Sequence, residues 1–131
     1  MLTILVDEAY AFDFLAILEV KYWNSIATKN KSTEDIRNKM HECANHIKKQ
    51  ISEQKFFEIT ESDEYLNLLE ANRKTFEWVD KAKTDSCKAS DVDRSNYERC
   101  KARNALQEKF FPDRLISEVK FGYNEAYEHK P

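Results

Sequence analysis

Residues 7–27 read DEAYAFDFLAILEVKYWNSIA, a stretch without glycine or proline in which apolar residues recur at helical spacing. Both residue types are also scarce elsewhere, since the 131 residues hold one glycine, Gly122, and two prolines, Pro112 and Pro131. Strand-rich folds use glycine and proline in tight turns, whereas the interiors of long helices exclude them. The sequence therefore predicts an all-α protein. It also excludes the glycine-rich phosphate loops of P-loop and dinucleotide-binding enzymes.

Capping residues predict where four main helices begin. The second, third and fourth should start near Ser32, Ser62 and Ser90, and Pro112 should end the fourth. A short C-terminal helix should follow. The expected ranges are 8–27, 33–54, 63–84 and 91–111 for the main helices, with a bend near 55–62, and 114–121 for the short one.

Each expected helix carries an apolar stripe that should face one shared core. The chain therefore forms one domain over 1–131, with a tail at 123–131 that is expected to fray. The short segment from Thr84 to Ser90 predicts that the third and fourth helices form an antiparallel hairpin. On the first helix we expect Asp13 and Glu19 to face solvent. The first stripe is Ala11, Phe14, Leu15, Leu18, Tyr22 and Ile26, and the second is Ile36, Met40, Cys43, Ile47 and Ile51.

Composition restricts the classes of function. The net charge of −3, with 34% charged and 41% hydrophobic residues, is typical of a soluble globular protein and argues against a dedicated nucleic-acid binder. A local basic patch at Lys48, Lys49 and Lys55 is the weakest alternative and would bind nucleic acid in a salt-dependent way. No apolar run has the length of a membrane span, so no membrane partner is expected.

The cysteines and the first residues of the chain indicate its cellular compartment. Three cysteines, Cys43, Cys87 and Cys100, are an odd number without metal-knuckle spacing, which predicts free thiols in a reducing compartment. Asp7 and Glu8 directly follow the apolar first residues, a pattern that argues against a signal peptide. We expect the protein to be cytoplasmic.

The third and fourth helices share a seam that is polar for a buried face. Asn96, Arg99 and Arg103 lie on the fourth stripe with Val92, Leu106 and Phe110, and Asn72 lies on the third stripe with Tyr65, Leu69, Phe76 and Val79. Buried arginine is costly unless its guanidinium is paired. In the favoured interpretation the arginine stems pack at the stripe edge, and the heads meet water or the acids Glu70, Glu77 and Asp80. The alternative is a pocket that binds an anionic ligand or a partner carboxylate.

An enzyme hypothesis comes from four acids, Glu61, Glu64, Glu77 and Asp80. Their E-x-x-E and E-x-x-D pairs resemble those of the all-helical nucleotide pyrophosphohydrolases of the MazG type. The resemblance implies a Mg²⁺-dependent nucleoside triphosphate pyrophosphohydrolase, in which the two pairs lie on facing helices. Here 64–77 is expected to be one helix, which would separate the pairs by roughly 20 Å. Continuity of this helix therefore tests the alternative.

Residues 41–46 contain metal-ligand types, with Cys43 and His46 on one helical face. No second pair of comparable spacing exists to complete a four-ligand zinc site. We therefore expect no metal, and interpret Cys43 as a buried thiol between histidines that face solvent.

Aromatic residues are the best indication of function. They make up 12% of the chain, and adjacent pairs such as Tyr22 with Trp23 and Phe110 with Phe111 cannot both point into the core. Exposed aromatic residues are enriched at protein interfaces. The leading hypothesis is a non-catalytic protein-interaction or oligomerisation module that binds a protein partner or itself as a homodimer. Its expected interface residues are Trp23, Phe111 and Tyr123, with Arg99 and Arg103 as polar specificity elements.

Overall fold

The computed structural model describes residue 2 and residues 4–113, and this part of the chain is helical without any strand. The all-α prediction is therefore confirmed. Five helices pack together: α1 (Glu8–Ala27), α2 (Thr33–Ile51), α3 (Glu53–Thr60), α4 (Asp63–Lys83) and α5 (Ala89–Phe110). No described helix is long and apolar enough to cross a membrane. The short helix expected at 114–121 and the tail at 123–131 lie outside the described residues.

The second expected helix is divided in two, and this corrects its predicted range of 33–54. α2 ends at Ile51, and Ser52 takes a positive φ of 85° that breaks the helix. The Ser52 hydroxyl then accepts a hydrogen bond from the Lys55 amide at 3.2 Å and so caps α3. The chain changes direction at Ser52 and again before α4. The region where a bend was expected, 55–62, therefore consists mostly of the short helix α3.

The helix starts follow the capping prediction only in part. Ser62 caps α4 as expected, since its hydroxyl accepts a hydrogen bond from the Tyr65 amide at 3.1 Å. Ser32 precedes α2 but makes no side-chain capping bond. α5 begins at Ala89, before the expected start signal, because the Asp91 carboxylate accepts from the Lys88 amide at 3.0 Å.

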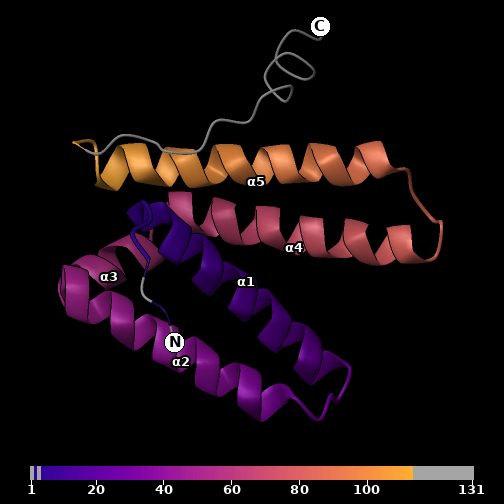
Figure 1. Cartoon of the computed structure of the whole chain (residues 1–131), viewed down its shortest axis with the longest axis horizontal. Helices are drawn as coiled ribbons and strands as arrows, with labels where there is room; N and C mark the ends of the chain where they lie inside the picture. Colours follow the sequence, from indigo (N-terminus) through magenta and orange to yellow (C-terminus); the bar gives the residue numbers. More distant parts are fainter. Residues whose placement is uncertain (1, 3, 114–131) are drawn as a thin grey trace, which may run out of the picture.

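Figure 1 shows α5 running back along α4, with α1 crossing against this pair and α2 lying beside α1. Residues from all five helices build the core where the start of α1 meets the others. α1 and α4 separate toward the ends of both helices (Figure 1). The apolar core is Ala9, Phe12, Leu15, Ala16, Ile47, Phe56, Ile59, Tyr65, Leu68, Leu106 and Phe110.

The buried face of α1 differs from the predicted stripe. Phe14 and Ile26 are 53% and 42% exposed, whereas the core contains Phe12 and Ala16. α1 is apolar on several sides, so helical period alone does not choose which side is buried. Polar contacts from α5 help set its rotation about the helix axis, and these contacts form the site described next.

Candidate functional site

A buried polar cluster joins α1, α4 and α5, with Asp13 at its centre. The Asn72 side-chain amide donates a hydrogen bond to Asp13 Oδ1 at 2.8 Å. Arg103 Nη1 donates to Asp13 Oδ2 at 3.3 Å. All three residues are buried, and Arg103 is only 4% exposed. One carboxylate from α1 thus binds both helices of the α4–α5 pair.

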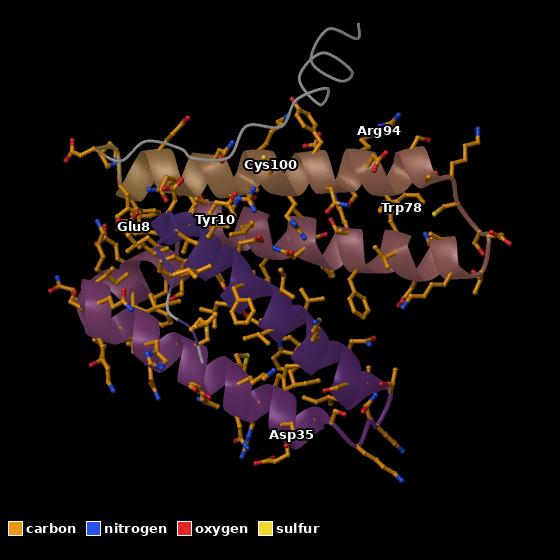
Figure 2. The ribbon with its side chains drawn as sticks, in the orientation of Figure 1. Glu8, Tyr10, Asp35, Trp78, Arg94 and Cys100 are labelled. Carbon is orange, nitrogen blue, oxygen red and sulfur yellow. The ribbon has the colours of Figure 1, made fainter. Side chains whose placement is uncertain are left out.

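Two more side chains, the aromatic Tyr10 and the cationic Arg99, lie beside this polar cluster. The Arg103 guanidinium lies over the Tyr10 ring at 4.2 Å from its centroid, a favourable cation–π geometry. Arg99 Nε lies 3.9 Å from Asp13 Oδ2, and the Arg99 side chain is 27% exposed. Figure 2 shows Tyr10 near the start of α1, beside α5. Two guanidinium groups therefore lie beside one carboxylate, and Arg99 is the more open of the two.

The sequence prediction brought Asn72, Arg99 and Arg103 together correctly but assigned their contacts wrongly. Arg103 does not reach water, and Asp13 does not face solvent. The acids expected to receive the arginines have other contacts: Glu70 and Glu77 pair with Arg73, and Asp80 lies 3.7 Å from Lys83. The actual partner is an acid 90 residues away in sequence, which helical spacing on α5 cannot reveal.

Asn96, the fourth predicted binding residue, is half-buried on α5, and no described contact links it to Asp13. Recognition of an anion by Arg99 and Arg103 stays a prediction. Within the chain, Asp13 already supplies an anion to both arginines. The cluster therefore has a clear structural role, which is to hold α1 on the α4–α5 pair.

A second polar contact that the sequence analysis missed involves Gln107, which is 1% exposed. Its side-chain oxygen accepts from the Ala9 amide at 2.8 Å, and its nitrogen donates to Glu8 Oε1 at 3.1 Å. The first helical turn has backbone amides without partners in the helix, and Gln107 satisfies one of them. Polar residues inside apolar stretches, such as Asp13 between two phenylalanines, are the signal that could have indicated these contacts.

Tyr65 forms another buried polar link to α1. Its side chain is 3% exposed, and its hydroxyl donates to Glu19 Oε2 at 3.0 Å. Burial, followed by the nearby Glu19 carboxylate, raises the pKa of Tyr65 far above its usual value. Glu19 is half-buried and bonded to Tyr65, so the expectation that it faces solvent is wrong.

We expect Tyr65 to make the fold sensitive to alkali. Above about pH 10 a tyrosine ionises in the unfolded chain while folded Tyr65 keeps its proton, so stability falls as pH rises. This one group contributes a slope of up to about 1.4 kcal/mol per pH unit. Urea unfolding between pH 9 and 12 should show a shallower decline for Tyr65→Phe than for the wild type. Tyr22→Phe is the control, and identical slopes for all three proteins would contradict the assignment.

The four acids of the pyrophosphohydrolase pattern do not come together. α4 is continuous from Asp63 to Lys83, which separates Glu64 from Glu77 by about 20 Å along the axis. Glu61 lies at the end of α3, and Glu64 pairs with Lys109 at 2.9 Å, which lowers the Glu64 pKa. Among the described residues, no three acids, histidines or cysteines are grouped to hold a metal ion. The helix continuity that tests this alternative thus counts against it.

Cys43 belongs to the side of α2 that packs on the core, as its stripe position predicted. Burial raises the pKa of the Cys43 thiol to about 11, and the neighbouring Glu42 charge adds to the effect. His41 and His46 are exposed beside it. Cys43, Cys87 and Cys100 are all free cysteines. The structure therefore places a protonated, partly covered thiol where a metal ligand was considered.

Searches of protein-family models, of curated proteins and of solved structures each found no match to this chain. The evidence for function therefore comes from the chain's own surface.

The most informative surface lies where α1 extends beyond the core. Trp23 is 61% exposed, although it occupies the same helical face as the buried residues Phe12 and Ala16. The apolar cluster shared by the five helices contains no α1 residue after Ala16, although Leu18 is also buried, and α1 and α4 diverge toward their C-terminal ends (Figure 1). On α4, Phe76 is half-buried and Val79 is 38% exposed. We call these uncovered apolar residues, together with Ile26, the α1–α4 surface.

The three predicted interface residues have different environments. Trp23 is exposed and contacts Tyr22 edge-on, with ring centroids 5.5 Å apart. Phe111 is half-buried, and the Lys55 ammonium lies 5.6 Å from its ring centroid. Tyr123 lies outside the described residues. The expectation that one member of the Tyr22–Trp23 pair points outward is confirmed.

Proposed function

We propose that this chain is a non-catalytic protein-interaction module and that the α1–α4 surface is where its partner binds. The observation that carries the proposal is the exposure of Trp23 in line with the buried residues Phe12 and Ala16 of α1. Tryptophan is among the residues that contribute most to protein interfaces. A partner's apolar side chains would continue the core between the separating ends of α1 and α4. The occupant is a protein or a second copy of the chain.

The finer architecture belongs to the same proposal. We take the scaffold to be a bundle of four main helices, with α3 as a short connector and α4 and α5 as an antiparallel hairpin. The free cysteines support a cytoplasmic location. The buried polar groups support a structural rather than a chemical use, since Asn72 and Arg103 both donate hydrogen bonds to Asp13.

Substitution of Trp23 by aspartate should weaken binding at the α1–α4 surface without unfolding the chain, because the side chain is exposed. We expect at least about a tenfold loss of affinity, the size seen when an interface tryptophan is removed. Sedimentation velocity across a concentration range measures self-association, and capture of a partner measures hetero-association. Leu66→Asp, at a side chain of α4 that is 52% exposed but lies off this surface, is the matched control. Equal association by the wild type and Trp23→Asp would overturn the proposal.

A further inference from the structure

A groove of about 480 Å³ lies between α4 and α5. Small residues contribute to its lining, and among the described residues Trp78 is the one aromatic side chain there. Figure 2 shows Trp78 on α4 and Arg94 on α5 near the same end of this helix pair. The small lining residues are Ala71, Ser95 and Ala102.

This groove opens on the side of the α4–α5 pair that faces away from α1. Lys74 lines it, two residues beyond Asn72, and Lys101 lines it, two residues before Arg103. Two residues correspond to a rotation of roughly 200° about a helix axis. Asn72 and Arg103 both contact Asp13 of α1, so Lys74 and Lys101 lie on the opposite face.

The charges along the groove are balanced, and their order is symmetric. Three acids and three bases line it, so a second copy would meet no net repulsion. Along α5 the order is Asp91, Arg94, Glu98 and Lys101, which alternates in sign. Arg94 and Glu98 are equidistant from residue 96, and so are Asp91 and Lys101. A copy of α5 laid antiparallel and centred at residue 96 would place every charge opposite its complement.

We propose that this groove binds a second copy of the chain, with the two α5 helices antiparallel about a two-fold axis level with residue 96. Arg94 then faces Glu98 of the second copy, and Asp91 faces its Lys101. Each pair occurs twice, as a self-complementary two-fold interface requires. The inference rests on the proposed function, that of an interaction module, and names a partner for a face separate from the α1–α4 surface.

The contact between Thr75 and Ser95 fixes which residues of α4 lie level with the two-fold axis. Their hydroxyl oxygens are 2.8 Å apart, so residue 96 of α5 lies level with Lys74 of α4. The axis therefore places Trp78 opposite Glu70 of the second copy, since each is four residues from Lys74, with the small Ala71 next to that position. It also brings the two copies of Lys74 together, and this contact is repulsive.

The face is large enough for a dimer. Helices of 21 and 22 residues, packed side by side, offer a face about 30 Å long and about 20 Å wide. Two such faces would bury roughly 1,200 Å² in total, at the lower end of stable specific interfaces. We therefore expect a reversible dimer that weakens as salt screens the charge pairs.

Charge reversal on α5 tests the pairing directly. Arg94→Glu and Glu98→Arg each place like charges opposite one another across the axis, and each should weaken dimerisation about tenfold. The double variant exchanges the charges and should restore the dissociation constant to within about threefold of wild type. Sedimentation velocity of the full chain measures the constant, and circular dichroism confirms that each variant is folded. Arg37→Glu, at an exposed arginine on α2, is the matched control.

Lys74→Gln provides a second test in the opposite direction, since removing the repulsion at the axis should strengthen the dimer. In a Trp23→Phe background, Trp78 is the one tryptophan left, and its emission should shift to the blue as the dimer forms.

A wild-type protein that stays monomeric up to about 1 mM would overturn this inference and leave the proposed function to partner capture. A dimer that Trp23→Asp abolishes and α5 charge reversal leaves unchanged would overturn the inference and support the α1–α4 surface instead.

Discussion

Asp13→Ala should lower the free energy of unfolding by about 3–5 kcal/mol, the cost typical of removing one partner from a buried ion pair. The substitution leaves Arg103, which is 4% exposed, without the carboxylate at 3.3 Å, and it removes one of the two acceptors of the Asn72 amide. Urea unfolding followed by circular dichroism measures the change. Glu77→Ala, at an exposed acid paired with Arg73, should cost at most about 1 kcal/mol and serves as the control.

A double replacement separates the cost of leaving one buried charge unpaired from the net contribution of the Asp13–Arg103 pair to stability. Asp13→Leu combined with Arg103→Met removes both charges of the buried pair and keeps similar volume, and the half-buried Arg99 is the charge that remains beside it. Buried pairs replaced by apolar residues often cost little. We expect the double variant to recover most of the stability that Asp13→Ala loses. A double variant as unstable as Asp13→Ala would show that polar contacts, rather than an unpaired charge, dominate the cluster.

Leu68→Ala should destabilise the chain by about 2–5 kcal/mol, because it removes a fully buried side chain at the centre of the core and leaves a cavity. Leu68 is 0% exposed, while Leu66, two residues earlier on α4, is 52% exposed. Leu66→Ala therefore makes the same chemical change on the same helix with little loss of buried area. We expect it to change stability by less than about 0.5 kcal/mol. Chemical denaturation of both variants under one set of conditions measures the contrast.

The outcome for this leucine pair also tests the assigned rotation of α4. The predicted stripe on this helix contained Tyr65, Leu69 and Asn72, and it left Leu68 out although Leu68 is more buried than Leu69. Similar losses from Leu66→Ala and Leu68→Ala would mean that α4 presents a different side to the core.

Local signals predicted helices well where they were unambiguous. Ser62 caps α4 as expected, and the stripe of α2 is buried or half-buried at every predicted position. The stripe of α5 placed Arg103, Leu106 and Phe110 on the buried face correctly. These predictions depend only on period and on capping chemistry, both of which are properties of neighbouring residues.

The sequence indicated some of the residues of the candidate site but not the acid at its centre. The polar seam placed Asn72, Arg99 and Arg103 on the facing sides of two helices, and the structure brings them together around Asp13. The identity of the acid was not accessible, because an arginine on one helix can pair with any acid that tertiary packing brings near. The three acids expected to pair with these arginines, Glu70, Glu77 and Asp80, have other partners.

The sequence by itself determined that this chain is helical and approximately where its helices lie, because the near-absence of glycine and proline and the helical period act within each segment. Tertiary structure alone decided which side of α1 is buried, that α2 ends at Ile51, and that Trp23 remains uncovered beyond the core. α1 is apolar on several sides, so its rotation depends on contacts from distant helices, chiefly Asp13 with Arg103 and Ala9 with Gln107. Such contacts join residues about a hundred positions apart, and a periodic pattern within one helix contains no information about them.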